Sequence, residues 1–416
     1  QVPHSGDSPF IDLRSRFRDG QGASVPRYLP AHVMPDPVVR WLDFAFRGGR
    51  VNEGTALFRG RTSDFPFRKH QGRFEVRFEA EEVQLAFRKE WPHLHDVKAN
   101  VVFDGAKMVL SSSRARYLDS RVRHCRVEIP NMHRARLLVD GVADGPLSDV
   151  LRTLRETPLS KRIGENPLAD FQAKGKSRLD LRLEVPISSR RQSPLSVAGE
   201  LQLINNSLSI NERLTFDQLD GKFHFKNSDF RAEAIQGRWS ENPVEFAIAT
   251  EQGRTTITAR GRADSQSLQK LAVPFADAFS GETSWDASLV LPHDRDRGVE
   301  LQIYSGLEGV AVDLPAPFGK RHGETRPFQL IRSLSDEHSA ELKIAYGPRF
   351  RTAIAVDDSG GLDRASFHFG AGMPDLPDTR RIRITGSLDG VVPEAWTGLL
   401  TVYGGGEAHG DGPGLP

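Results

Sequence analysis

The chain has 416 residues, enough for two or three average domains or for one elongated, repetitive domain. Its 56 Lys and Arg residues are balanced by 55 Asp and Glu residues, which leaves a formal net charge of +1. This balance argues against nucleic acid as a partner, because a phosphate-binding domain normally carries a clear basic excess.

Cysteine content and apolar runs limit the class of protein further. The single cysteine, Cys125, excludes an internal disulfide and a zinc site built on two cysteines. Cys125 alternates with Val127 and Ile129 on one strand face, which predicts a buried, unreactive thiol. The chain has no apolar run of 18 residues and no signal peptide. Because it starts at Gln1 and not at a methionine, we interpret it as an internal fragment, and any anchor or signal would lie upstream of it.

The first elements are a strand end, a loop and a short helix. Residues 1–27 have the pattern of the end of a preceding segment followed by a loop. Asp36 and Pro37 then supply an N-cap and a first-turn proline, and apolar residues recur at helical spacing until Gly48 and Gly49. This pattern predicts a one-faced helix that lies against a sheet.

From Val51 onward the apolar residues recur with a period of two. In the stretch 72–80, Phe74, Val76 and Phe78 point one way while charged residues point the other. A strand with one dry and one wet face is typical of an antiparallel sheet covered on one side only. The same alternation recurs to the end of the chain, with turn residues at short, regular intervals. The sequence therefore predicts an all-β, mainly antiparallel meander.

Only a few segments interrupt this alternation. Helical spacing returns in 146–154 and in 265–279. The stretch 157–176 is rich in Pro and Gly and is a candidate subdivision of the domain 28–403, although the strand pattern resumes unchanged after it. Residues 404–416 consist mostly of Gly, Pro, Asp and Glu, and we expect this tail to be disordered.

No residue pattern in the chain predicts catalysis. It contains no phosphate-binding loop, no nucleophile elbow and no His-Glu-x-x-His motif. His93 and His95 alternate, but they follow Trp91-Pro92 in a predicted loop and have no third ligand at a suitable spacing. We therefore predict no enzyme activity, no cofactor and no metal.

The apolar strand faces allow two structures. In a sealed sandwich these faces would meet each other, whereas in an open groove they would line a trough for a foreign hydrocarbon. Alternation alone does not distinguish these two arrangements, and it slightly favours the sealed one. A sealed protein would be a structural or scaffolding protein without lipid cargo.

Several short motifs, in order, resemble the YhdP branch of the AsmA-like proteins of Gram-negative envelopes, which are bridge-like lipid transfer proteins. The resemblance covers about 28–400. The motifs are Tyr28-Leu29-Pro30, Gly48-Gly49-Arg50-Val51, Phe65-Pro66-Phe67, Gly72-Arg73-Phe74-Glu75-Val76, Trp91-Pro92, Asn205-Asn206-Ser207-Leu208, Leu219-Asp220-Gly221-Lys222-Phe223, Asp313-Leu314-Pro315-Ala316-Pro317 with Lys320, and Ile384-Thr385-Gly386-Ser387-Leu388.

This resemblance implies an elongated, twisted, taco-shaped β-groove that carries phospholipid acyl chains through the periplasm. It also implies contacts with the inner and outer membranes, or with proteins there, at the ends of a longer chain with an N-terminal inner-membrane anchor. Roughly twenty strands spaced about 4.8 Å apart would make a sheet on the order of 100 Å long. The candidate groove residues are Phe74, Val76, Phe78, Leu85, Phe87, Leu181, Leu183, Leu201, Leu203, Phe223, Phe225, Phe246, Ile248, Leu289, Leu301 and Ile303.

Overall fold

The computed structural model describes residues 8–24, 36–67, 69–132, 136–159, 170–186, 195–210, 214–270, 276–294, 298–334, 341–357, 362–388 and 390. These residues form 21 β-strands and a few short helices. The chain divides within two strands, β9 and β10, into two compact units. The N-terminal unit comprises Gln1–Asn206 and Phe223–Ser228, and the C-terminal unit comprises Ser207–Lys222 and Asp229–Pro416.

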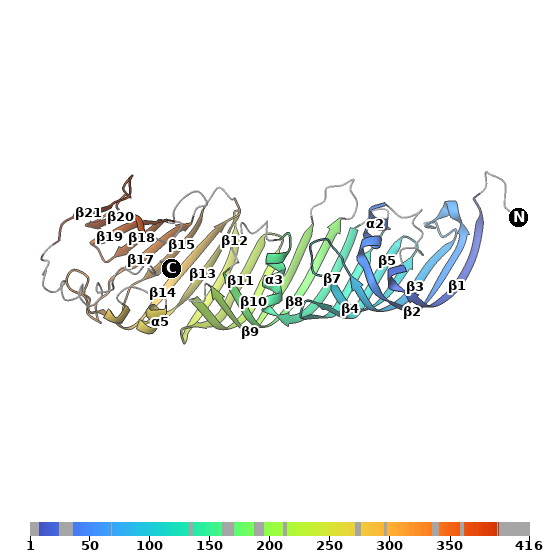
Figure 1. Ribbon diagram of the computed structural model, residues 1–416, viewed down its shortest axis with the longest axis horizontal. Coiled ribbons are helices and arrows are strands. Elements are labelled where there is room, and N and C mark those ends of the chain that lie inside the picture. Colours follow the sequence, from blue (N-terminus) through green and yellow to red (C-terminus); the bar gives the residue numbers. More distant parts are fainter. Residues whose placement is uncertain are drawn as a thin grey trace. The chain divides into compact units, whose positions relative to one another are not determined.

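The N-terminal unit is an antiparallel meander (Figure 1). Its strands are β1 (Phe10–Gln21), β2 (Phe46–Arg61), β3 (Arg73–Leu85), β4 (Leu94–Asp104), β5 (Lys107–Tyr117), β6 (Ser120–Ile129), β7 (Arg136–Pro146), β8 (Phe171–Pro186) and most of β9 (Ser196–Ile210). From β1 to β8 each strand pairs with the next one in the chain. Short turns suffice for such connections, because neighbouring antiparallel strands need no crossover.

A bulge keeps the apolar residues of β3 on one face. The register with β4 shifts between Ala80 and Val83, and Glu82 has a positive φ of 55°. The extra residue in the bulge restores the alternation, so Val83 and Leu85 point to the same side as Ala80.

Two short helices are attached to this sheet. Helix α2 (Asp36–Ala45) precedes β2, and Trp41 Nε1 donates to the carbonyl oxygen of Phe87 at 2.9 Å. Helix α3 (Leu147–Glu156) links β7 to β8. The buried carboxylate of Asp149 accepts hydrogen bonds from the Asp119 amide and the Ser120 hydroxyl, at 3.0 and 2.6 Å. These contacts fix α3 against the turn between β5 and β6.

The C-terminal unit continues the meander. Its strands are most of β10 (Leu214–Lys226), β11 (Asp229–Trp239), β12 (Asn242–Glu251), β13 (Arg254–Asp264), β14 (Phe279–Pro292), β15 (Val299–Ser305), β16 (Val310–Val312), β17 (Phe328–Leu334), β18 (Glu341–Tyr346), β19 (Phe350–Val356), β20 (Leu362–Phe369) and β21 (Ile382–Gly386). Helix α5 (Ser265–Lys270) and a 3-10 turn, η5 (Ala276–Ala278), lie between β13 and β14.

Two pairings in this unit depart from a simple meander. Strand β15 pairs with β17, while the short β16 pairs with the first residues of β14. Strand β21 runs parallel to β20, unlike the antiparallel pairs before it. The predicted all-β, mainly antiparallel fold with a few short helices is therefore confirmed.

The structure differs from the sequence prediction at several boundaries. The predicted first helix ends at Ala45, and Gly48 and Gly49 lie inside β2. Gly49 has a φ of +117°, and a Cβ there would lie 2.7 Å from the Cα of Val83. This glycine therefore serves a bulge in the sheet and does not end the helix.

Other predicted segments can be placed in the same way. Strand β1 is longer than the strand end expected in 1–27, and it pairs with β2 over most of its length. Strand β8 already begins at Phe171, inside the stretch interpreted as a connection. The predicted helix at 146–154 is confirmed as α3, whereas the tail 404–416 lies outside the described residues. No described helix has the length and apolar character needed to cross a membrane.

Candidate functional site

One face of the N-terminal unit carries a row of mostly apolar residues that crosses its strands. Directly paired residues of neighbouring strands point to the same side of a sheet. The row consists of Phe17, Gly54, Phe78, Val101, Leu110, Val127, Val139 and Leu183, each paired with the next. We call the side on which this row lies the apolar face of the N-terminal unit.

Further rows run beside it on the same face. One contains Ala56, Val76, Phe103, Met108 and Ile129. Another contains Val51, Ala80, Ala99, Ser112, Cys125, Gly141 and Leu181, and a third contains Leu85, Leu94 and Tyr117. The apolar face is therefore several residues wide.

Aromatic clusters flank both edges of this face. At one edge, the rings of Phe58 and Phe65 lie 6.1 and 5.2 Å from that of Phe74. At the other edge, the ring of Phe87 lies 5.9 Å from Trp91 and 6.3 Å from Tyr117. Such rings cover large apolar areas with few rotatable bonds.

The opposite face of the same strands is charged. Its rows include Arg18, Glu53, Glu79, Asn100, Ser111, Arg126, Asp140 and Arg182 in register. A hydrogen bond from Arg73, at 2.8 Å, lowers the pKa of Glu75, and Arg77 adds to the effect. Lys98 bridges Glu79 and Glu81 at 2.7 and 2.6 Å. We call this side the charged face; it is suited to contact with water.

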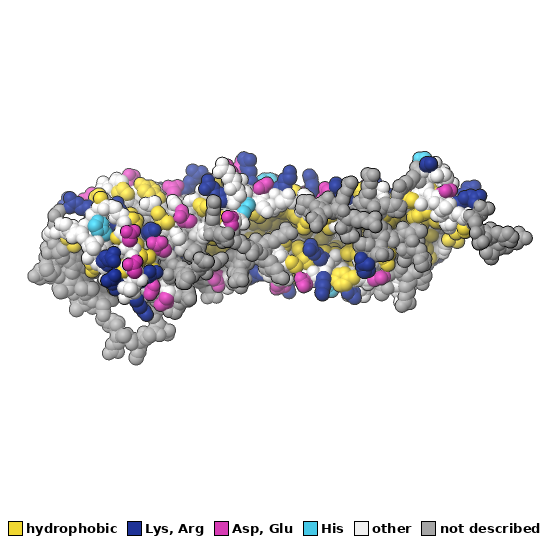
Figure 2. Space-filling model, turned by 90° about the horizontal axis from the view of Figure 1, so that it is seen from above, with side chains coloured by type: hydrophobic (Ala, Val, Ile, Leu, Met, Phe, Trp, Pro, Cys, Tyr) yellow, Lys and Arg dark blue, Asp and Glu magenta, His cyan; other side chains and the backbone are white. Residues whose placement is uncertain are grey.

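The side chains of the apolar face differ in burial, and several large ones are only half-buried. Small or branched residues such as Ala80, Val97 and Ala99 are buried, at 4 to 6% exposure. Phe103, Met108 and Ile129 are buried as well, at 4 to 8% exposure, whereas Phe78, Leu110 and Leu183 retain intermediate exposure. A second sheet packed on this face would bury such side chains fully. Figure 2 shows hydrophobic side chains gathered in a hollow over these strands, with charged side chains along its edges.

The remaining candidates of this unit lie on β9 and β10. Leu201 and Leu203 alternate along β9, and the rings of Phe223 and Phe225 lie 6.3 Å apart on β10. A Cβ built on Gly199 would lie 2.6 Å from Cζ of Phe225. Because Gly199 has the same parity as the two leucines, all four side chains share one face.

The C-terminal unit has an apolar face of its own. One row consists of Ile248, Ile257, Leu289, Leu301, Arg332, Leu342, Ile354 and Ala365. The neighbouring row consists of Phe246, Ala259, Ala287, Ile303, Leu330, Ile344, Thr352 and Phe367. All five candidates predicted in this unit lie in these two rows, and all are half-buried.

The structure thus places fifteen of the sixteen predicted candidates on strands. Eleven of them lie on the two apolar faces, and the other four share one face of β9 and β10. Phe87 is the exception, because β3 ends at Leu85 and the Phe87 ring joins an edge cluster. Sequence reasoning missed Phe17, Leu110 and Val139 as members of the central row. Apolar and polar residues alternate in their strands as well, so the sequence indicated that these residues lie on an apolar face. Their place in the central row could not be predicted, because it depends on the register of the strands.

Cys125 lies on the apolar face, opposite Ser112 and Gly141. Burial, with a smaller contribution from the Asp140 carboxylate, raises the pKa of its thiol from 9.0 to about 11. A thiol with such a pKa is almost fully protonated at neutral pH and a poor nucleophile. This agrees with the predicted unreactive thiol, although Cys125 is half-buried and not fully buried as predicted.

The described residues are better suited to bind apolar groups than to hold a metal ion. Among them, no three His, Cys, Asp or Glu side chains are arranged to hold a metal ion. The two-sided strands define a class of protein: an antiparallel β-sheet protein with one half-exposed apolar face and one charged face. Such a face gains free energy when it covers hydrocarbon, at roughly 25 cal/mol per Å².

Comparison with known proteins identifies the family. The family model described as YhdP protein matches residues 1–416, so the chain belongs to the YhdP family. The intermembrane phospholipid transporter YhdP of Escherichia coli (strain K12) is 26% identical over 327 residues, which cover 77% of this chain and 26% of that protein. The chain therefore spans about a quarter of the curated relative's length. No solved structure matches it.

Proposed function

We propose that this chain is a segment of a bridge-like lipid transfer protein and that phospholipid acyl chains lie on its apolar faces. The observation that carries the proposal is the central row from Phe17 to Leu183, which crosses eight successive strands and in which every residue except Gly54 and Val101 stays half-exposed. The family membership and the relative's description as an intermembrane phospholipid transporter support it.

In this proposal the protein supplies a path and no covalent chemistry. Burial of a tail contributes about 0.8 kcal/mol per methylene, wherever along a uniform apolar face the methylene lies. A lipid can therefore slide with little change in free energy, while its polar head group stays at the open side in water. The proposed setting is the periplasm, between an inner-membrane anchor of the longer protein and the outer membrane.

The alternative is a structural envelope protein whose apolar faces are closed in the cell by other protein. The two functions differ in what accompanies the purified chain. We would purify it from bacterial cells without detergent, and analyse it by native mass spectrometry and lipid extraction. Co-purified phospholipid in stoichiometric amounts is the expected result. A chain free of lipid would favour the structural role.

A further inference from the structure

A loop in the C-terminal unit lies on the apolar face. This loop, residues 313–326, follows β16 and is closed by two backbone hydrogen bonds between Val312 and Lys320, at 2.8 and 3.0 Å. Its Phe318 ring lies 4.9 Å from Phe350 and 6.2 Å from Phe369, which both belong to an aromatic row on the apolar face. The loop therefore packs an aromatic ring on the apolar face.

Arg326 and Tyr346 hold this loop in place. The Arg326 guanidinium donates hydrogen bonds to the carbonyl oxygens of Phe318 and Gly319, at 3.2 and 2.8 Å. The Tyr346 hydroxyl donates to the same Phe318 oxygen at 2.7 Å. The guanidinium also lies over the Tyr346 ring at 5.2 Å. Because two side chains donate three hydrogen bonds to these two carbonyls, the loop is well fixed.

Lys320 is a buried cation without an ion pair to any described residue. Its side chain is 5% exposed, and its Nζ donates to the carbonyl oxygens of Val310 and Arg321, at 2.5 and 3.2 Å. An ammonium group has three protons, so one has no partner among the described residues. Burial lowers the pKa of Lys320. A buried charge is costly unless an opposite charge compensates it.

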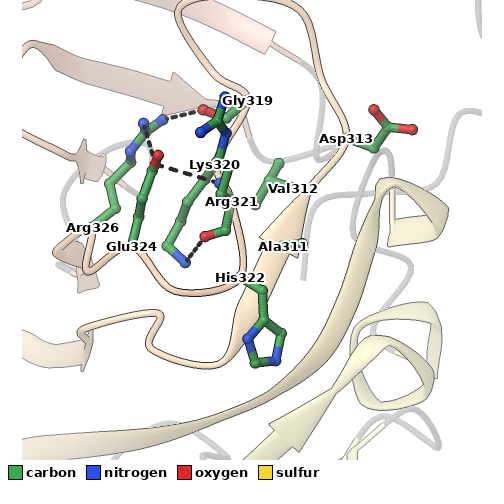
Figure 3. Close-up of a pocket in the computed structure, with 9 residues that line it drawn as sticks. All are labelled: Ala311, Val312, Asp313, Gly319, Lys320, Arg321, His322, Glu324 and Arg326. Carbon is green, nitrogen blue, oxygen red and sulfur yellow. Dashed lines mark hydrogen bonds and ion pairs between the residues drawn. The ribbon is translucent and has the colours of Figure 1, made fainter.

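A hollow of about 580 Å³ opens beside this ammonium (Figure 3). Arg321 and His322 line it with exposed side chains, and Arg326 lines it with a half-buried one. Glu324 adds a carboxylate, which is 3.6 Å from Arg326. In the view of Figure 3, the Lys320 ammonium and the His322 ring extend to the same side of the loop. Asp313 adds a second carboxylate, and Ala311 and Val312 add apolar surface. The three cationic side chains of the lining, Lys320, Arg321 and Arg326, therefore outnumber its two carboxylates by one.

We propose that this hollow binds a phosphate group through the free proton of Lys320 and the side chains of Arg321 and His322. A phosphate has several strong acceptor oxygens and can accept from three donors on different residues. It would also supply the negative charge that Lys320 lacks. Resting on the proposed function, we infer that this phosphate belongs to a phospholipid whose tails cover the Phe318 and Phe350 rings.

The test compares the full chain with the double variant Arg321→Gln/His322→Gln. Both side chains are exposed, so the substitutions should leave the loop folded. Arg254→Gln is the matched control, because Arg254 is an exposed arginine in the same unit. Isothermal titration calorimetry would use three ligands: inorganic phosphate, dihexanoyl-phosphatidylglycerol below its micelle concentration, and dihexanoylglycerol, which has the tails but no phosphate.

We expect the double variant to bind the short phospholipid at least tenfold more weakly than the wild type and the control. Binding of dihexanoylglycerol should not change. If the double variant also binds inorganic phosphate more weakly than the wild type, the phosphate group alone is enough for binding at this site. If only the binding of the phospholipid is weakened, the site needs the tails as well as the phosphate. Loss for inorganic phosphate alone would overturn the assignment to a lipid.

Equal phospholipid binding by all three proteins, or none by the wild type, would overturn the proposal too. The extraction of co-purified lipid separates this failure from failure of the proposed function. If the double variant retains its lipid in cells, the transport role stands without this phosphate site.

Discussion

A charge placed on the apolar face distinguishes an open groove from a sealed core. Leu110 is half-buried in the central row, between Val101 and Val127. Full burial of a leucine is worth about 1.5–3 kcal/mol, so Leu110→Asp should cost the sheet only about 1–2 kcal/mol if this face is open to water or lipid. In a sealed core, the cavity and the buried carboxylate together would cost more than about 4 kcal/mol.

The same substitution should expel lipid. A tail that passes residue 110 would lose contact for two or three methylenes, which is about 2 kcal/mol or roughly a 30-fold loss of occupancy there. The matched control is Ser111→Asp on the charged face, where Arg126 is a direct cross-strand partner. This control should keep both its lipid and its stability.

Two measurements on each protein complete the comparison. Hydrogen exchange of the amides in β4 to β6 reports local stability, and extraction followed by mass spectrometry counts the lipid. The reasoning predicts a folded, lipid-poor Leu110→Asp variant. Global unfolding of this variant, or an unchanged lipid content in a folded one, would refute it.

Three further predictions concern the thiol, a tight contact and the loop. Because the Cys125 pKa is raised to about 11, the free energy of unfolding should fall between pH 9 and 11 by at most about 3 kcal/mol. Denaturant titrations of Cys125→Ala should not show this fall. The same pH profile in the variant and the wild type would contradict the assigned cause. Gly54→Ala places a Cβ 2.3 Å from the Phe17 ring and should lower the free energy of unfolding by about 1–3 kcal/mol. Unchanged hydrogen exchange in β1 and β2 would show that the ring moves away freely. Arg326→Ala removes the donor to two carbonyls and should speed amide exchange in 313–326 at least tenfold; unaltered exchange would mean that the loop is held by other contacts.

Much of the fold could be predicted from periodicity alone. The alternation of Phe74, Val76 and Phe78 with charged residues correctly indicated a strand with two different faces. The helix at α3 was equally evident, because its leucines recur at helical spacing. Local patterns of this kind are encoded within a few residues, so a sequence displays them directly.

Features that depend on pairing could not be predicted in this way. A glycine such as Gly49 after a helical pattern usually indicates the end of a helix. Here Gly49 has a positive φ because it lies in a bulge of β2, close to Val83 on the next strand. Phe17 pairs with Gly54, and Val139 pairs with Leu183. To predict these pairs, one must know the register of strands that are far apart in the sequence. Register is set by turns and bulges together.

The loop on the C-terminal apolar face shows the same limit. Its prolines suggested only an edge or a loop. The burial of Lys320 and the clamp formed by Arg326 and Tyr346 arise from contacts across β16 to β18. No spacing rule predicts that a lysine in such a loop is buried without a carboxylate.

The central claim is that lipid tails contact the apolar face and not the charged face. Phe78 and Arg77 are neighbours on β3 and point to opposite sides. A photoreactive benzoyl-phenylalanine placed at either position, in cells labelled with radioactive phosphate, would report directly on what lies there. The account predicts a phospholipid adduct at position 78 and none at 77. Equal labelling at both positions, or none at 78 in a folded protein, would contradict it.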